Sequence, residues 1–378
     1  MKKFENAKIY TDAGFITSDL VFDERIVSFG SEDGEVISIP DGAMVIPGFI
    51  DQHIHGAGGS DAMDGTEKDL ENIASTVARE GTVAFLATTM TQIPENITAA
   101  LNAVKEYMAE KRDTGAEVIG VHLEGPFIAA AHKGAQPGEY IAVPSVEVFD
   151  KYNEASGNNI KIVTLAPECD GAEKLISHLD SIGVVASIGH SSAKFENVDA
   201  AVKAGAKNVT HTYNAQSALH HREIGVVGSA MLLDELNCEI IADTIHVSVP
   251  AMKMLVKNKP FDKVSLITDA MRAKGLPDGE SELGGQKVFV KDGQARLCDG
   301  TLAGSVLRMN VALKNMVEKV GVPLSRAIDF ATINPARLLG IDKDYGSISL
   351  GKKASFAVLD SSFNVLMTIR DGKIIYQA

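Results

Sequence analysis

Two histidines spaced one residue apart, His53 and His55, follow an apolar run over residues 44–50. In a β-strand, side chains two positions apart share a face and lie roughly 6.6 Å apart, so both imidazoles can converge on one cation. Imidazole is a common ligand of zinc, iron and similar metals. A histidine pair in an ordinary core has the same spacing, so the pair becomes informative only because later apolar runs also end in ligand-type residues.

Five further ligand-type or titratable residues stand at the ends of later apolar runs: Glu124, His190, His211, His246 and Asp269. The catalytic residues of a parallel β/α barrel come from the C-terminal ends of different strands, and a set rich in His and carboxylate predicts a metal site with a nearby base. We therefore expect His190 and His211 to be metal ligands beside His53 and His55. Solvated polar residues on a barrel rim are the alternative interpretation.

Glu124 stands between an apolar run and the Gly125-Pro126 turn signal, where an ionised carboxylate needs a partner or a cation. His122 lies two positions earlier on the same face, deeper in the predicted barrel, and is interpreted as a packing histidine or as a support for a ligand. The histidines interpreted as solvated are His132, His178, His220 and His221, and the adjacent Arg222 leaves another role open for the last two.

Asp269 follows four apolar or small residues and has no adjacent Lys or Arg. A carboxylate at the end of the last strand can accept a proton from water at a metal site and later return it to a leaving group. We predict that Asp269 is this catalytic base. A further metal ligand, or a helix N-cap before Met271, is the alternative role.

The elements that must position these residues form a repeating pattern, in which β-branched apolar runs alternate with helical segments. The runs cover residues 45–55, 82–89, 117–124, 161–168, 184–190, 208–214, 238–243 and 263–269, and helical spacing occurs in 67–79, 97–111, 173–181 and 193–204. This alternation is typical of βα units on a parallel sheet, and eight strands close a (β/α)8 TIM-type barrel.

Both ends of the chain instead contain short alternating runs separated by Gly, Asp and Asn, which indicate antiparallel strands. We predict a small β-sandwich domain from residues 1–46 plus 345–378, and a barrel over 47–344. Within the barrel, a hairpin should turn at Asp292-Gly293. Two helices, over 305–320 and 325–339, should complete the ring.

Composition excludes several classes of protein. The formal charge is -14 with 45% apolar and 23% charged residues, so nucleic acid and anionic membrane surfaces are disfavoured partners. No apolar tract approaches the roughly 18 residues of a membrane span, and no signal peptide is recognised, so we expect a cytoplasmic protein. Three cysteines without a CxxC spacing argue against a disulfide framework and a thiolate zinc site.

Taken together, these motifs resemble the N-acetylglucosamine-6-phosphate deacetylases of the amidohydrolase superfamily, over essentially the whole chain. The resemblance rests on 47–56, His122-Leu-Glu-Gly-Pro-Phe127, Lys133-Gly-Ala135, Ile188-Gly-His-Ser191, Thr210-His-Thr-Tyr-Asn-Ala215, 241–247, Thr268-Asp-Ala270 and Leu302-Ala-Gly-Ser305. The His-x-His motif is common to the superfamily, whereas His-Leu-Glu-Gly-Pro and His-x-Tyr-Asn-Ala are more specific. The implied reaction converts N-acetylglucosamine 6-phosphate into glucosamine 6-phosphate and acetate.

The resemblance also implies a metal centre. Glu124, His190 and His211 would hold the main divalent metal, and the intact pair His53 and His55 favours a second metal bridged through Glu124. Zinc is the expected metal, with iron, manganese or cobalt as alternatives, at one or two ions per subunit.

The implied substrate contacts involve residues outside the metal centre. Asn214, the Ala215 amide and Arg222 would take the phosphate, and His246 a sugar hydroxyl. Arg222 would come from the neighbouring subunit of a homodimer. Other implied contacts are Ala135, Gln136 and Leu302. Gln136 replaces a histidine that often contacts the sugar in this family, although a Gln can still donate and accept a hydrogen bond.

Two other functions remain open at this point. A dihydroorotase-like hydrolase of cyclic amides would need a carboxylated lysine at the end of the fourth run, and 161–168 has none there. A barrel that has lost catalysis and serves as a scaffold would have lost ligands. Bound divalent metal and acetate release would separate these alternatives.

Overall fold

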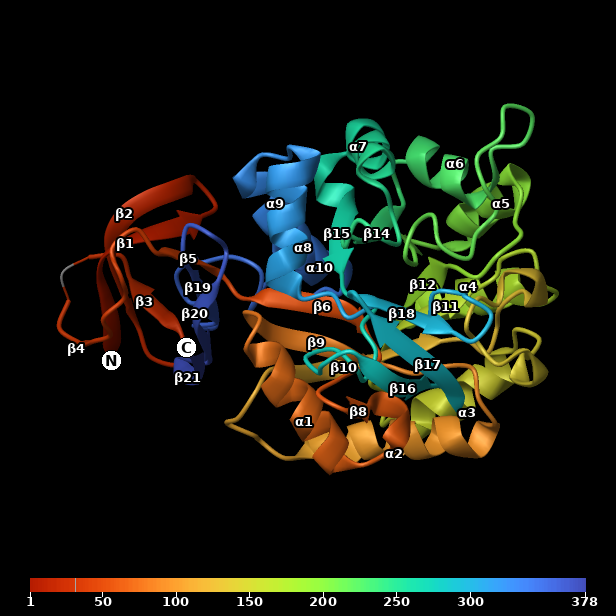
Figure 1. Ribbon diagram of the computed structural model, residues 1–378, viewed down its shortest axis with the longest axis horizontal. Helices are drawn as coiled ribbons and strands as arrows, with labels where there is room; N and C mark the ends of the chain where they lie inside the picture. Colours follow the sequence, from red (N-terminus) through yellow and green to blue (C-terminus); the bar gives the residue numbers. More distant parts are fainter. Residues whose placement is uncertain (31) are drawn as a thin grey trace.

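The computed structural model describes residues 1–30 and 32–378 and contains a barrel and a flanking sheet (Figure 1). In the described part of the chain, eight parallel strands follow one another around the barrel in sequence order. They are β6 (Phe49–Ile54), β9 (Thr82–Thr88), β10 (Glu117–Glu124), β11 (Ile160–Leu165), β12 (Val185–Ile188), β13 (Asn208–Val209), β14 (Asn237–Ile241) and β15 (Val264–Ile267). The backbone N–H of Asp269 donates to the carbonyl of His53 at 2.8 Å, which joins the last strand to the first. The predicted eight-stranded barrel is confirmed.

Helices cover the outside of the barrel, as the amphipathic spacing predicts. They are α1 (Glu67–Ala78), α2 (Pro94–Ala109), α3 (Val146–Ala155), α4 (Ala172–Ser181), α5 (Phe195–Ala204), α6 (Gly225–Leu232), α7 (Val249–Asn258), α8 (Met309–Asn315), α9 (Leu324–Ala331) and α10 (Ile333–Leu338). Helix α1 illustrates how the local sequence favours a helix. The Thr66 side chain caps it by accepting the N–H of Asp69, and Leu70, Ile73 and Val77 are buried on one face.

Several barrel strands end earlier than their apolar runs predicted. β12, β13 and β15 end two residues before His190, His211 and Asp269 respectively. The reason is the backbone conformation of these residues, whose φ angles are 47°, 29° and 47°. A positive φ is incompatible with an extended ladder, so each strand must end before the functional side chain.

The helical segments near the C-terminus also differ from the prediction. The segment 305–320 begins its helix only at Met309, and α8 continues as a π-helix, η5 (Met316–Val320). The segment 325–339 is divided into α9 and α10 at Thr332. Pro335 explains the break, because its ring clashes with the carbonyl four residues earlier in a continuous helix.

The flanking domain contains strands from both ends of the chain, as predicted. These are β1 (Lys2–Thr11), β2 (Gly14–Phe22), β3 (Ile26–Ser28), β4 (Glu35–Val36), β5 (Met44–Pro47), β19 (Phe356–Leu359), β20 (Val365–Arg370) and β21 (Lys373–Gln377). They form one hydrogen-bonded sheet with the order β21-β20-β19-β5-β1-β2-β3, and β4 pairs with β1. The sheet folds over its own core, where Phe4, Phe22 and Phe356 contact one another. We propose domain boundaries at 46/47 and 344/345.

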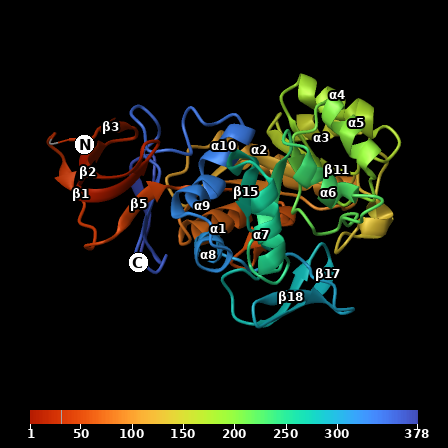
Figure 2. The same cartoon turned by 90° about the horizontal axis from the view of Figure 1, so that it is seen from above.

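A small antiparallel sheet projects from the barrel after β15 (Figure 2). It contains β16 (Gly279–Leu283), β17 (Gln286–Lys291) and β18 (Gln294–Leu297). The predicted turn at Asp292-Gly293 is confirmed, since Lys291 pairs with Gln294 and both turn residues have positive φ. The first strand, β16, was not predicted.

Short elements complete the structure. They are β7 (Gly56–Ala57), β8 (Ser60–Asp61) and the 3₁₀ turns η1 (Ala62–Asp64), η2 (Ala130–His132), η3 (Gly138–Tyr140) and η4 (Phe261–Lys263). Within residues 1–30 and 32–378, no helix has the length and apolar character needed to cross a bilayer.

Candidate metal centre

Three ligand-type side chains from three different strand ends meet at the C-terminal mouth of the barrel. Nε2 of His190 lies 3.2 Å from Oε1 of Glu124, and Nε2 of His211 lies 3.0 Å from the same oxygen. The two ring nitrogens are 3.1 Å apart. All three side chains are buried. The triangle of Glu124, His190 and His211 can therefore offer three donor atoms to one ion.

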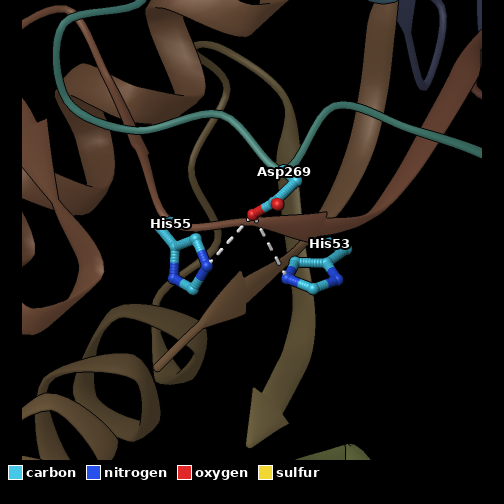
Figure 3. A group of neighbouring side chains, drawn as sticks. All are labelled: His53, His55 and Asp269. Atoms are coloured by element: carbon cyan, nitrogen blue, oxygen red, sulfur yellow. Dashed lines mark ion pairs between the residues drawn. The ribbon is translucent and has the colours of Figure 1, made fainter. Parts of the chain in front are cut away.

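A second group consists of His53, His55 and Asp269 (Figure 3). The Asp269 carboxylate points between the two rings, with Oδ1 3.5 Å from Nε2 of His53 and 3.3 Å from Nε2 of His55. His53 belongs to β6, and His55 follows it directly after that strand. The spacing argument for the His-x-His pair thus holds, because both rings face the same point.

Glu124 lies between the two groups. Oε1 is 3.4 Å from Nε2 of His53, in addition to its contacts with His190 and His211, and Oε2 is 3.3 Å from Nε2 of His55. One carboxylate therefore contacts all four imidazoles through its two oxygens. This geometry is suited to a carboxylate that bridges two metal ions.

The buried carboxylates of the site favour the protonated forms of His53 and His55. Burial alone would lower the pKa of His53, but the charges of Glu124 and Asp269 and the hydrogen bond to Glu239 outweigh it and raise the pKa to about 9. The pKa of His55 is likewise raised well above its usual range, by Asp269 and Glu124 against the effect of burial. The imidazoles therefore carry positive charge, which a bound cation can replace.

The carboxylates shift in the opposite direction. Burial would raise the pKa of Asp269, but the nearby His53 and His55 lower it to about 2. Burial also opposes the ionisation of Glu124, yet the surrounding imidazoles hold its pKa well below the usual range. Both groups are therefore ionised at neutral pH, and Asp269 is in the form that can accept a proton.

The donor set fits a divalent metal. Nδ1 of His190 donates to the carbonyl of His132 at 2.8 Å, so Nε2 is the nitrogen left to bind an ion in the site. Nε2 of His53 is buried without a hydrogen-bond partner. Ligands of a tetrahedral zinc ion with bonds of about 2.0–2.2 Å lie roughly 3.3–3.6 Å apart, close to the separations within both groups. Imidazole and carboxylate suit zinc, iron, manganese and cobalt.

Three of the site residues share an unusual backbone conformation at the mouth of the barrel. His190, His211 and Asp269 all have positive φ, which is uncommon outside glycine and tends to occur at functional sites. Gly189 allows the backbone before His190 to pack closely against two threonines, because an added Cβ would lie 2.7 Å from Cβ of Thr210 and 2.8 Å from Cγ2 of Thr164. No residue pattern predicted this shared conformation.

His122 occupies the position expected for it beneath the site. Its Nδ1 lies 3.1 Å from the carbonyl of Gln52, and its Nε2 lies 2.7 Å from Oγ1 of Thr164. Burial lowers its pKa to about 3, so the ring is neutral. Both ring nitrogens are engaged, so His122 supports the barrel interior.

A cavity of about 230 Å³ opens above these residues. Most of the predicted site residues line it: His55, Glu124, Ala135, Gln136, His190, His211, Asn214, Ala215, His246, Asp269 and Leu302. His53 is fully buried beneath the cavity. Nδ1 of His246 lies 2.6 Å from Oδ2 of Asp243, which leaves its Nε2 free of that contact.

Arg222 is the predicted residue that one chain does not bring to the cavity. Its side chain is exposed, and Nη1 lies 2.8 Å from Nε2 of the neighbouring His221. His220 is exposed in the same loop, as is His221. Any contact of Arg222 with a ligand in this cavity would require another subunit or a movement of the loop.

Sequence reasoning missed several residues around the cavity. Met90, Leu283 and Thr301 line it, although they are far apart in the chain. Thr301 adjoins the Leu302-Ala-Gly-Ser305 motif, so that motif was the available signal. Leu283 belongs to β16, which was not predicted. Glu239 lies inside β14 and does not line the cavity; the presence of a carboxylate within the apolar run 238–243 was the signal that could have found it.

Larger hollows lie elsewhere on the molecule. One of about 470 Å³ adjoins Arg112 and Arg370, and another of about 660 Å³ adjoins Lys207 and Arg337. Among the described residues, the ligand-type groups that could hold a metal lie at the mouth of the barrel and in its interior, and none lies in these two hollows. The chemistry is therefore concentrated at the mouth.

Comparison with known proteins decides the family. The model of the Amidohydrolase family matches residues 44–375, a span that includes every residue of the metal centre. The chain belongs to the amidohydrolase family. This amidohydrolase is therefore a hydrolase of a metal-dependent family, and it carries side-chain groups able to hold a metal ion.

Curated relatives of this amidohydrolase act on phosphorylated amino sugars. N-acetylglucosamine-6-phosphate deacetylase of Bacillus subtilis (strain 168) is 44% identical over 342 residues, which cover 90% of this chain and 86% of the relative. N-acetylgalactosamine-6-phosphate deacetylase of Escherichia coli O157:H7 is 39% identical over 325 residues, 86% of each chain. The predicted resemblance to deacetylases is confirmed.

Solved structures agree with this assignment. N-acetylglucosamine-6-phosphate deacetylase from Pasteurella multocida superimposes with a TM-score of 0.94 at 30% identity and covers 100% of both chains. An Asp-to-Ala variant of the Mycobacterium smegmatis enzyme, in complex with N-acetyl-D-glucosamine-6-phosphate, gives 0.93 at 28% identity, covering 100% of this chain and 99% of that one. The barrel and flanking sheet thus form an amidohydrolase fold along the whole chain.

Proposed function

We propose that this amidohydrolase removes the N-acetyl group of N-acetyl-D-glucosamine 6-phosphate to give D-glucosamine 6-phosphate and acetate. The observation that carries the proposal is the convergence of Glu124, His190 and His211 with Asp269 at one mouth of the barrel, in a chain 44% identical to such a deacetylase. The reaction belongs to amino-sugar catabolism and recycling.

For the metal, we assign Glu124, His190 and His211 to one ion, and His53 and His55 with a bridging Glu124 to a second. Zinc is the proposed metal, with iron, manganese or cobalt as alternatives. When bound, the divalent metal supplies polarisation of the acetamide carbonyl and lowers the pKa of water towards about 7.

Asp269 is the proposed catalytic base. Its carboxylate is ionised and lies beside both ligand groups, so it can accept the proton of the attacking water. Returning that proton to the amine nitrogen lets the C–N bond break, because an unprotonated amide nitrogen is a poor leaving group. Asp269 would thus act as base and then as acid within one turnover.

The cavity supplies the proposed substrate contacts. Asn214 and Ala215 lie on its rim, where their amide groups can donate to phosphate oxygens. We assign His246 to a sugar hydroxyl, and the remaining lining to Ala135, Gln136 and Leu302. Arg222 would reach the phosphate of the neighbouring subunit, which the exposed position of its loop supports. We therefore propose a homodimer.

The identity of the amino sugar is a second question. The 39% identity to an N-acetylgalactosamine-6-phosphate deacetylase supports a second candidate substrate, the C4 epimer. Acetate release from both epimers, each with and without the 6-phosphate, tests both proposals on one sample. No acetate from any of them after addition of divalent metal would overturn the deacetylase assignment and favour a scaffold.

The proposed location is the cytoplasm. Cys169, Cys238 and Cys298 all carry free thiols. Free thiols are typical of a reducing compartment, which supports this placement.

A further inference from the structure

The interior of the barrel holds a carboxylate, Glu239, that no role at the cavity explains. It lies in β14 and is fully buried. An ionised group in this position is costly unless all its acceptor sites are used. Glu239 must therefore be held by a complete set of donors.

Four N–H groups supply that set. Oε1 accepts from Nε2 of Gln52 at 2.7 Å and from Nδ2 of Asn208 at 3.0 Å. Oε2 lies 3.1 Å from Nδ1 of His53 and accepts the backbone N–H of His211 at 3.2 Å. An ionised carboxylate has about four lone-pair sites, so the acceptor capacity of Glu239 is filled.

The contact with His53 has a chemical consequence. Because Glu239 is an acceptor only, Nδ1 of His53 must carry the hydrogen. In the neutral ring, Nε2 then presents a lone pair, and this is the nitrogen that faces Glu124 and Asp269. A metal-ligating histidine whose other nitrogen donates to a carboxylate has a fixed tautomer and a more basic ligand atom.

The contact with His211 extends the effect to the other ligand group. His211 has a positive φ, and the Glu239 carboxylate holds its backbone N–H directly. One buried carboxylate thus contacts a residue of each group. Glu239 does not touch the cavity, so it can act only through these ligands.

We propose that Glu239 is a positioning residue of the metal centre, which fixes the tautomer of His53 and the backbone of His211. The inference rests on the proposed metal site but not on the identity of the substrate.

A metal ion among Glu239, His53 and His122 is the competing interpretation, because their ligand-type atoms also lie close together. The hydrogen bonds argue against it. Both ring nitrogens of His122 are engaged by Gln52 and Thr164, and both oxygens of Glu239 have donors. This second cluster is a hydrogen-bonded support for the metal centre.

The test is metal binding by the full chain. Metal-stripped wild type and Glu239→Gln are titrated with Co²⁺ by visible absorption, and Zn²⁺ affinities are measured by chelator competition. In Glu239→Gln, an amide with a single acceptor oxygen replaces a carboxylate that accepts from four N–H groups. Nδ1 of His53 then need not carry the hydrogen, so the tautomer of His53 is no longer fixed. We expect the affinity for the metal ion that His53 binds to fall 10- to 100-fold, the range typical of such supporting contacts.

The matched control is Glu80→Gln. Glu80 is a buried carboxylate too, but it pairs with Lys274 at 2.8 Å and does not contact a ligand. We expect Glu80→Gln to lower the melting temperature while its metal affinities stay within threefold of wild type. If Glu239→Gln fails to fold, Glu239→Asp gives the same comparison, since it keeps the charge but shortens the reach to His53.

A double variant isolates the path through His53. Combined with His53→Ala, Glu239→Gln should cost less further affinity than it does in the otherwise wild-type chain, because only the contact with His211 then remains to be lost. Wild-type metal affinities in Glu239→Gln, or equal losses in Glu239→Gln and Glu80→Gln, would overturn the inference. Metal binding as expected without acetate release would instead count against the proposed function alone.

Discussion

The side chain of Gln136 is bonded directly to Glu124: its Nε2 donates to Oε2 of the carboxylate at 2.6 Å. Its Oε1 accepts the backbone N–H of Thr91 at 2.7 Å, so the amide is fixed in one orientation. Gln136 is also buried. Gln136, where the family resemblance implies a histidine, therefore holds a proposed metal ligand through one of its amide N–H groups.

Gln136→Ala should weaken metal binding and turnover together. Without the amide, Oε2 of Glu124 loses a charge-assisted hydrogen bond, and we expect roughly tenfold lower metal affinity. Chelator competition and initial rates of acetate release measure the two effects. Gln92→Ala is the control, because its amide bonds Gly284 and not a ligand. An unchanged affinity in Gln136→Ala would show that the bond does not support Glu124.

Asp269→Asn should abolish turnover while metal stays bound. The amide cannot accept a proton, and loss of a general base typically costs roughly 10²- to 10⁴-fold in rate. Elemental analysis and acetate release on the same preparation give both quantities. Asp278→Asn, an exposed acid in the following loop, should retain the wild-type rate. Near-normal turnover in Asp269→Asn would remove it from the proposed role.

Arg222→Ala should raise the Michaelis constant for the phosphorylated sugar by at least tenfold and leave that for the unphosphorylated sugar unchanged. A bidentate contact to phosphate is lost only with the first substrate. Lys253→Ala, which removes an exposed cation from α7, is the control. Equal effects of Arg222→Ala on both substrates would place the phosphate elsewhere.

Mixing subunits tests whether Arg222 acts across an interface. Neither Arg222→Ala nor Asp269→Asn alone should be efficient at low substrate concentration. A mixture should regain activity if Arg222 serves its neighbour, because one site of each hybrid dimer then has both residues. A mixture no better than the sum of its components would mean that Arg222 serves its own chain.

His53→Ala should lower the metal stoichiometry by one equivalent. The variant removes one imidazole of the His53, His55 and Asp269 group and leaves the Glu124, His190 and His211 triangle intact. Elemental analysis after dialysis measures the count. His178→Ala, which removes a histidine paired with Asp150 on the surface, should bind metal like wild type. An unchanged count in His53→Ala would make the first pair structural.

Metal uptake by the stripped protein should release protons at pH 7. The pKa of His53 is raised to about 9, so its ring is protonated below that pH and must lose the proton to bind metal. Apparent affinity should therefore rise with pH, by up to about tenfold per unit per proton displaced, and the contribution of His53 should level off above about pH 9. Calorimetry in buffers of different ionisation enthalpy counts the protons, and His53→Ala should release fewer protons than wild type.

The sequence by itself determined the barrel, because eight apolar runs separated by amphipathic segments have few other ways to bury their surface. It also indicated the end of the barrel at which chemistry occurs, since ligand-type residues follow those runs. The C-terminal ends of three barrel strands could not be predicted, because a positive φ at His190, His211 and Asp269 ends each strand early. Periodicity describes burial, and it does not record the backbone angle at a strand end.

Only the tertiary structure decided which atoms meet. Glu124 and His211 are 87 positions apart, at the end of β10 and just after β13, and two other strands separate these strands in the ring. Their contact of 3.0 Å forms because the closed ring brings these strand ends together over the barrel mouth. The tertiary structure also showed that Gln136 is hydrogen-bonded to Glu124, and that the Glu239 carboxylate contacts His53 and His211. Residue types and spacing specify which chemistry is available. The closure of the ring specifies the distances, because contacts between distant segments are set by packing of the whole barrel and not by local pattern.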